Sequence, residues 1–126
     1  MSTQPIILYG IRNCDTVKKA RQWLDDHSLA YTFHDFKTQG VPASRLTHWL
    51  RQVGWETLLN RKGTTWRRLD PSQQASANDA DGARRLMLDH ASVIKRPVVE
   101  WGDTENSVVT VGFNTDDWQT RVNTGG

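Results

Sequence analysis

The sequence predicts an α/β fold with three layers of helix and sheet around one core. An apolar run at residues 6–9 predicts a buried strand, and apolar residues at helical spacing follow it as far as Leu24. An aromatic-rich strand at residues 31–36 completes a strand–helix–strand unit, in which we expect the two strands to be parallel. A helical insert comes next, and two further strands and a last helix complete the order β-α-β, insert, β-β-α on a mixed sheet.

The remaining elements follow from turn residues and spacing. In the insert we expect helices at 44–53, 55–60 and 80–90, a short helix after Asp70, and a basic loop at 61–68. Residues 93–101 and 107–111 form two strands joined by a hairpin connection at 102–106. Asn114 is expected to cap the last helix, and Trp118 lies on the inner face of that helix.

Composition predicts a single globular domain over residues 1–126, with a core at about 5–37 and 93–122 and the insert at about 43–90. No stretch approaches the roughly 20 apolar residues of a membrane span. The first residues lack the basic and apolar regions of an export signal, so we expect a cytoplasmic protein without membrane association. One cysteine excludes an internal disulfide and suits a reducing compartment. A net charge of +2 does not by itself indicate nucleic acid.

The single cysteine, Cys14, follows the first strand and stands where the first helix begins, with Asn13 as the expected N-cap. Unpaired N–H groups and the helix dipole stabilise a thiolate at such a position and lower its pKa. Lys18 and Lys19 would add to this effect, and Asp15 would oppose it. The sequence therefore indicates a reactive thiol, although an unpaired cysteine can also serve as a small buried hydrophobe.

Three segments carry a resemblance to a known family. They run from Tyr9 to Leu24 (YGIRNCDTVKKARQWL), from Leu58 to Arg61 (LLNR) and from Ile94 to Val98 (IKRPV). The sequence resembles the arsenate-reductase-like (ArsC) family and, within it, the Spx/YffB subgroup, over about residues 5–122. This resemblance implies a thioredoxin-like fold with a helical insertion. It also implies that Pro97 is a cis-proline facing the cysteine.

Members of that family that reduce arsenate attack the oxyanion with a cysteine and hold its charge with arginines, and glutathione or glutaredoxin resolves the product. Cys14 matches the nucleophile and Arg96 matches one arginine. Asn60 stands where a second arginine is expected, although Arg61, one place on, can substitute. Residues 110–112 offer no third arginine. Because arginine is the residue suited to grip an oxyanion, arsenate reduction is only the third hypothesis.

The redox regulators of the family often carry a Cys-x-x-Cys switch, but here Val17 occupies the second position. We therefore predict a glutathione-dependent thiol–disulfide oxidoreductase that uses Cys14 alone and no bound cofactor. Glutathione or a glutaredoxin-like protein would be its reductant, and a protein disulfide is one candidate substrate. The residues expected to bind the anion or thiol are Asn13, Arg61, Arg96 and Pro97.

The alternative is a non-enzymatic, Spx-like transcription regulator that binds RNA polymerase. A basic loop contains Trp66 among Arg61, Lys62, Arg67 and Arg68 and could dock an acidic protein or nucleic acid. We favour an ordinary solvated loop with Trp66 packed under the helical insert, and we do not expect nucleic acid. The four histidines show no metal-ligand spacing, so no metal site is predicted.

Overall fold

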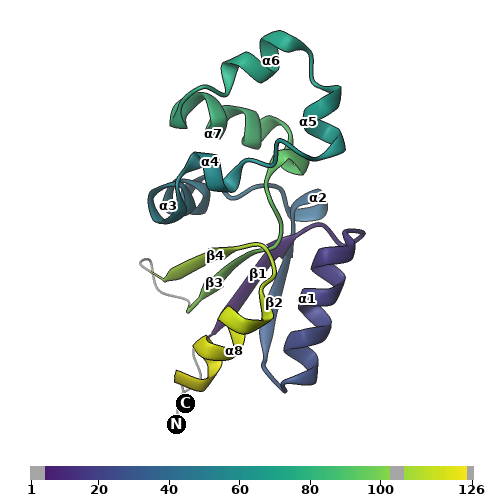
Figure 1. Ribbon diagram of the computed structural model, residues 1–126, viewed down its shortest axis with the longest axis vertical. Coiled ribbons are helices and arrows are strands. Elements are labelled where there is room, and N and C mark those ends of the chain that lie inside the picture. The colour runs from purple at the N-terminus through teal and green to yellow at the C-terminus, as the bar shows by residue number, and fades with distance from the viewer. Residues whose placement is uncertain (1–4, 103–106, 125–126) are drawn as a thin grey trace. The chain divides into compact units, whose positions relative to one another are not determined.

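The computed structural model describes residues 5–102 and 107–124. The chain divides into two compact units (Figure 1). Unit 1 combines Met1–His34 with Arg96–Gly126, and unit 2 holds Asp35–Lys95. The sheet lies almost wholly in unit 1, whereas unit 2 is helical. That the two units form a single domain stays a prediction.

The sheet has four strands in the order β2-β1-β3-β4. They are β1 (Ile6–Gly10), β2 (Tyr31–Asp35), β3 (Val98–Trp101) and β4 (Val108–Val111). Strand β3 runs antiparallel to both β1 and β4. Strand β2 lies beside β1 and is joined to it through helix α1 (Asp15–Asp26), so the sheet is mixed. The predicted α/β class with a mixed sheet is confirmed.

One face of this sheet holds the core of unit 1. Leu8 and Val99 are paired across β1 and β3 and so share that face, as do Ile6 and Trp101. Helix α8 (Thr115–Thr124) places Trp118, which is fully buried, against the same cluster. The residues that α1 adds to the cluster are Val17, Ala20 and Leu24. Both helices therefore pack on the same face of the sheet.

Aromatic rings surround the Trp118 indole. The centroids of Trp23, Trp101 and Phe113 lie 5.5, 5.2 and 4.9 Å from it, each ring nearly perpendicular to the indole. Edge-to-face pairs of this kind are stabilising beyond the area they bury. Trp118 thus joins α1, β3 and the segment before α8 into one packed unit.

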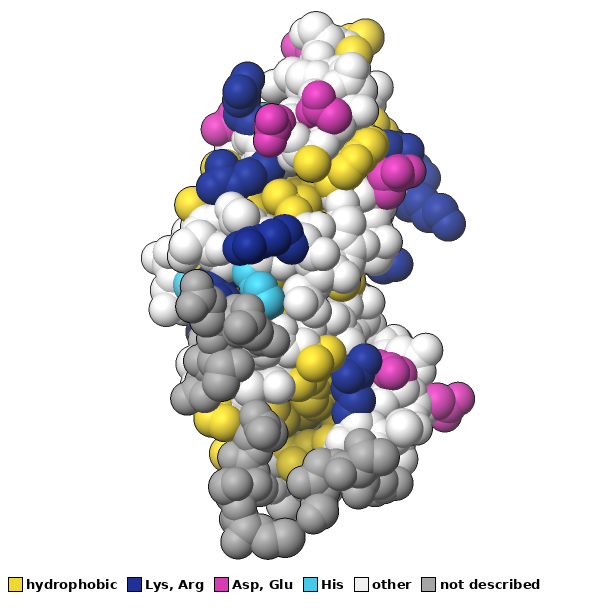
Figure 2. All heavy atoms as spheres, turned by 90° about the vertical axis from the view of Figure 1, so that its left-hand side faces the viewer, with side chains coloured by type: hydrophobic (Ala, Val, Ile, Leu, Met, Phe, Trp, Pro, Cys, Tyr) yellow, Lys and Arg dark blue, Asp and Glu magenta, His cyan; other side chains and the backbone are white. Residues whose placement is uncertain are grey.

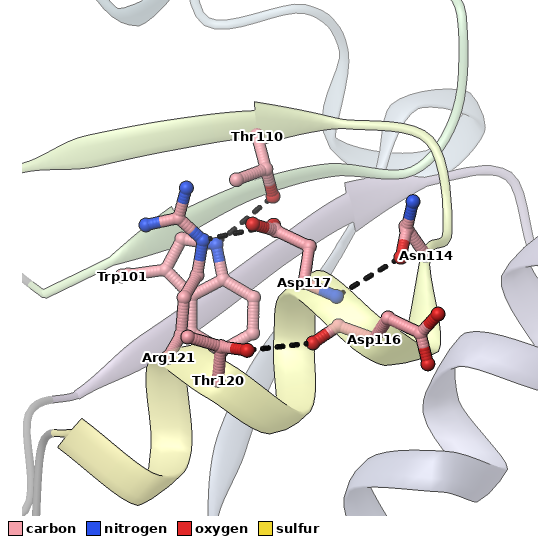
Figure 3. A network of polar contacts seen from close by, with 7 residues as sticks. All are labelled: Trp101, Thr110, Asn114, Asp116, Asp117, Thr120 and Arg121. Carbon is pink, nitrogen blue, oxygen red and sulfur yellow. Dashed lines mark hydrogen bonds and ion pairs between the residues drawn. The ribbon is translucent and has the colours of Figure 1, made fainter.

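Polar contacts fix the start of α8 (Figure 3). The N–H of Asp117 donates to Asn114 Oδ1 at 2.9 Å, which confirms Asn114 as the cap of this helix. One turn on, Arg121 Nε and Asp117 Oδ2 form an ion pair at 3.0 Å. The Trp101 indole N–H donates to Thr110 Oγ1 at 2.9 Å across β3 and β4. The first two bonds hold the start of α8, and the third joins β3 to β4.

Apolar side chains also reach the surface of unit 1. Figure 2 shows them in its lower half, beside Lys or Arg and Asp or Glu side chains. Among the described residues, Val108 of β4 is the exposed large hydrophobic side chain, at 46%. A change at Val108 should therefore cost little stability, which makes it a useful control position.

Unit 2 is built from short helices. They are α2 (Phe36–Gln39), α3 (Ala43–Val53), α4 (Trp55–Leu58), α5 (Thr64–Arg68), α6 (Pro71–Ser76), α7 (Ala80–Asp89) and the 3₁₀ helix η1 (Ala91–Val93). Helix α7 contacts both α3 and α4, and Trp49, Leu58 and Met87 of these three helices are fully buried. Asp70 caps α6 by accepting the N–H of Gln73 at 2.9 Å, so the short helix expected after Asp70 is present.

The prediction of a loop throughout residues 61–68 is wrong in its second half. Helix α5 occupies Thr64–Arg68, and the Arg67 N–H donates to the Gly63 carbonyl at 3.3 Å. The segment is a little over one turn long, too short for the repeat of apolar residues by which a helix is recognised.

The strand predicted at residues 93–101 is also too long. Strand β3 begins only at Val98, because η1 occupies Ala91–Val93 and ends the helical insert. Ile94 instead forms an isolated antiparallel bridge with Leu59 inside unit 2. The hairpin connection predicted at 102–106 lies mostly outside the described residues.

Helix α1 approaches β1 closely at Gly10. A Cβ atom at Gly10 would lie 2.7 Å from Val17 Cγ2. We expect Gly10→Ala to lower the free energy of unfolding by about 1–3 kcal/mol through overpacking. Urea unfolding should measure this loss, and Val108→Ala should stay within about 0.5 kcal/mol of the parent.

The double variant Gly10→Ala/Val17→Ala tests the cause. Since Val17→Ala removes both γ carbons, the double variant should lose less stability than the sum of the two single variants. Strictly additive losses would show that this contact does not limit the packing of α1.

Candidate active site

Cys14 lies at the junction between β1 and α1. The Cys14 N–H donates to the Ile11 carbonyl at 3.1 Å and closes a turn, and the Lys18 N–H donates to the Cys14 carbonyl at 2.9 Å. Cys14 has extended backbone angles, φ −90° and ψ 126°, and is the N-cap of α1. The expectation that Asn13 caps the helix is therefore wrong. Asn13 lies in the preceding turn with its side chain exposed, because the turn closes one residue later than expected.

Four influences lower the pKa of the Cys14 thiol against one that raises it. Partial burial acts to raise the pKa, because it disfavours the charged thiolate. The N–H of Val17, a hydrogen bond from the Arg96 side chain, the Arg96 charge and the N–H of Thr16 all stabilise the thiolate. The net result is a pKa below the ordinary value for a cysteine. A thiol so poised is a better nucleophile at neutral pH than a free cysteine side chain.

The two backbone donors follow from the position of Cys14 as N-cap. Thr16 and Val17 are the second and third residues of α1, whose N–H groups have no partner inside the helix. A capping side chain ordinarily accepts from this pair of N–H groups. In this structure no side-chain hydrogen bond caps α1, yet both groups act on the sulfur as charge stabilisers. The sequence predicted that unpaired N–H groups at the start of the helix would stabilise the thiolate, and the structure assigns that role to Thr16 and Val17, with Cys14 and not Asn13 as the cap.

Arg96 reaches Cys14 from the other segment of unit 1, at the entrance to β3. The peptide bond between Arg96 and Pro97 is cis, as the family resemblance implied. The Pro97 carbonyl accepts the N–H of Gly112 at 2.8 Å, which ties this entrance to the end of β4. The structure thus brings Cys14 and Arg96 together, with Pro97 buried directly after Arg96.

Cys14 itself is half-buried. It packs against the core cluster of unit 1, and its neighbours Arg12, Asn13, Asp15 and Thr16 are all exposed. Packing against the core holds the Cys14 side chain in a fixed position. Its exposed sequence neighbours leave the thiol open to solvent. This arrangement suits chemistry on an incoming disulfide better than a purely structural role.

Arg61 and Asn60 belong to unit 2. The Arg61 guanidinium lies over the Trp55 ring, 5.3 Å from its centroid. Asn60 stands where the family resemblance called for arginine, and its Oδ1 accepts the N–H of Lys62 at 3.1 Å. Its own N–H donates to the Val93 carbonyl at 2.8 Å, so Asn60 holds its loop in place.

The described residues contain neither a cluster of metal ligands nor a membrane-spanning helix. Within residues 5–102 and 107–124, no three His, Cys, Asp or Glu side chains gather where a metal ion could bind. No helix in this part of the chain is long and apolar enough to cross a membrane. In the basic segment of unit 2, Trp66 is half-buried and its carbonyl accepts a hydrogen bond from Gln74 at 2.8 Å.

The fold and site together define an α/β protein of the thioredoxin-like class, with its cysteine at the start of the first helix and a cis-proline at the entrance to β3. The model of the ArsC family matches residues 9–121, and the chain belongs to the ArsC family.

Three known proteins show how the chain relates to that family. The solved structure of the YFFB (PA3664) protein has 48% sequence identity and a TM-score of 0.83, covering 91% of this chain and 96% of that one. An arsenate reductase (ArsC) related protein from Brucella melitensis has 43% identity and a TM-score of 0.72, covering 97% and 98%. The global transcriptional regulator Spx 1 of Lactococcus lactis is more distant, at 25% identity over 119 residues, covering 89% of this chain and 84% of its own.

The contact between Arg96 and Cys14 leads to a prediction about the thiol. Arg96→Gln removes a hydrogen bond and a positive charge from the thiolate, so the pKa of Cys14 should rise. The rate of alkylation by iodoacetamide increases with pH as thiolate forms, and the midpoint of that increase should move to higher pH in the variant.

Lys19→Gln is the matched control. It removes the same charge from an exposed position of α1, and Lys19, which the sequence suggested would also lower the pKa of Cys14, is not among the groups that do so. Its alkylation midpoint should match that of the parent protein. Equal midpoints for Arg96→Gln and the parent would contradict the assignment of Arg96 to the thiolate.

Proposed function

We propose that this protein is a glutathione-dependent thiol–disulfide oxidoreductase that works through Cys14 alone. The observation that carries the proposal is the environment of the sulfur. Cys14 is the only cysteine of the chain, it is half-buried at a helix N-terminus, and Arg96 and two backbone N–H groups lower its pKa. A cysteine kept only for packing gains nothing from an arginine that stabilises its charged form.

The reaction follows from the presence of a single thiol. The Cys14 thiolate attacks one sulfur of a substrate disulfide, so a mixed disulfide with Cys14 forms and the other substrate sulfur leaves as a thiolate. The thiolate of glutathione then attacks the Cys14 sulfur and releases the second substrate thiol. A second glutathione attacks the resulting glutathione adduct and frees the Cys14 thiolate. One disulfide and two glutathiones thus become two substrate thiols and one oxidised glutathione.

Arg96 has two roles in this scheme. Its positive charge holds Cys14 as the attacking thiolate and stabilises that thiolate again when it leaves in the last step. Pro97 presents backbone to the bound thiol compound, and Asn13, which is exposed and precedes Cys14 in the chain, offers that compound its amide group. Arg61 of unit 2 is proposed to bind the anion, on the basis of the family resemblance alone. A reducing compartment such as the cytoplasm supplies the glutathione that the scheme requires.

Turnover of a small mixed disulfide tests the proposal. The substrate is the mixed disulfide of glutathione and 2-mercaptoethanol, with oxidised glutathione measured through glutathione reductase and NADPH. The parent protein should show turnover that depends on glutathione, and mass spectrometry should find a glutathione adduct on Cys14. Cys14→Ser should show no turnover because it lacks the nucleophile, and Arg96→Gln should turn over several-fold more slowly at neutral pH. A parent protein that is alkylated readily but does not turn over this substrate would overturn the proposal.

A second candidate is a non-enzymatic regulator that binds RNA polymerase, and the 25% identity to Spx 1 favours it. The basic segment of unit 2 is suited to an acidic protein surface, because Arg61, Lys62, Arg67 and Arg68 are all exposed. An arsenate reductase ranks third. The similar Brucella melitensis protein is described as related to one, but Asn60 replaces the arginine that the resemblance calls for.

Binding to RNA polymerase distinguishes a regulator from an enzyme. If the regulator role is correct, the full chain should bind purified RNA polymerase, and Cys14→Ser should bind equally well. The double variant Arg67→Gln/Arg68→Gln should bind at least tenfold more weakly, because it removes two positive charges from the segment. Absence of binding by the parent protein in low salt would exclude this role.

A further inference from the structure

A groove on the outer side of unit 1 is separate from the candidate active site. It lies between α1 and the edge strand β2 and has a volume of about 380 Å³. Its lining residues are Arg21, Asp25, Leu29, Ala30, Tyr31 and Phe33. This volume falls at the lower end of the range of roughly 300–1,000 Å³ that is usual for small-molecule sites. Arg21 and Asp25 follow Cys14 by about 10 and 16 Å along the axis of α1, so the groove does not include the thiol.

Two contacts fix the Arg21 side chain at one side of this groove. Its Nε donates to the Tyr31 hydroxyl at 3.0 Å, and its guanidinium lies over the Phe33 ring with the central carbon 4.2 Å from the ring centroid. Stacking and the Nε bond together set the plane of the guanidinium. The two terminal amino groups of Arg21 have no hydrogen bond to any of the described residues. This pair of donors suits one carboxylate held by two parallel hydrogen bonds.

Asp25 contributes the opposite charge one helical turn further along α1. Its side chain is exposed and has no hydrogen bond or ion pair in the part of the chain that the structure describes. Residues four apart on a helix commonly pair, but Tyr31 and Phe33 draw Arg21 away from Asp25. The groove is therefore lined by a cation and an anion that do not pair with each other.

One wall of the groove is apolar. Leu29 and Ala30 connect α1 to β2, and Leu29 packs on the core cluster, which supports this wall from beneath. A ligand that matches the groove needs a carboxylate for Arg21, a cationic group within a few ångströms of it for Asp25, and a small apolar portion. An α-amino acid with an apolar side chain combines these three features in one small molecule.

We propose that this groove binds a free α-amino acid with an apolar side chain. The carboxylate accepts hydrogen bonds from the terminal amino groups of Arg21, and the ammonium group pairs with Asp25. The side chain lies against Leu29 and Ala30. The site is independent of the chemistry at Cys14 and takes a different ligand.

NMR titration of the full chain, labelled with ¹⁵N, tests this site with L-leucine as the probe. Addition of L-leucine should shift the amide signals of residues 29–31 in a saturable manner. Two analogues each lack one charge: 4-methylpentanoate has no ammonium group, and isoamylamine has no carboxylate. Each analogue should bind at least tenfold more weakly than L-leucine. Non-saturable shifts, or equal binding of L-leucine and either analogue, would overturn the proposal.

Variants of the two charged residues complete the test. Arg21→Met keeps an unbranched side chain over Phe33 but removes the carboxylate ligand, and Asp25→Asn removes the charge that faces the ammonium. Each should weaken L-leucine binding at least tenfold, while Asp26→Asn, an exposed neighbour outside the groove, should bind as the parent does. The amide spectrum of each variant reports whether it is folded. Undiminished binding by folded Arg21→Met would refute the assignment.

Cys14→Ser should bind L-leucine normally, which separates this result from any failure of the proposed thiol chemistry.

Discussion

The close contact between α1 and β1 is the constraint on which the rest of unit 1 depends. Gly10 has no side chain, and Val17 occupies the space where one would lie. This contact fixes α1 against the sheet immediately after the turn that carries Cys14. The same helix face then continues through Ala20 and Leu24 into the cluster around Trp118. The position of the thiol therefore depends on core packing as well as on the turn that carries it.

The charge state of the thiol results from opposing influences of the same fold. Packing against the core excludes water from part of the sulfur and disfavours the thiolate. The start of α1 supplies N–H groups that favour it, and Arg96 adds a hydrogen bond and a full positive charge. Because Arg96 comes from a segment far along the chain, the balance exists only when both halves of unit 1 are assembled.

The sequence was most informative where a pattern extends over several turns or where a side chain has a strong local role. The strand at residues 6–9, helix α1, the buried Trp118 and the Asn114 cap all follow from periodicity or capping chemistry. Short helices such as α5 are too short to show a repeat of apolar residues. The change from η1 to β3 depends on contacts within unit 2.

The site itself was only partly predictable. Cys14 was identified from its place between a strand and a helix, but Asn13 was assigned the cap because asparagine favours both caps and turns. The proximity of Arg96 followed from family resemblance, since no local pattern connects residues so far apart in sequence. The pairing of Arg21 with Tyr31 and Phe33 spans only 10 and 12 residues, but it joins a helix to a strand and became visible only in the folded chain.

The presence of a single cysteine also determines how any oxidised form of this protein behaves. With no second thiol in the chain, every disulfide at Cys14 joins two molecules. Its release is then a second-order process, whose rate rises with the concentration of free thiols around the protein. The fraction of the protein held as an adduct at Cys14 consequently falls as free thiols around it become more abundant.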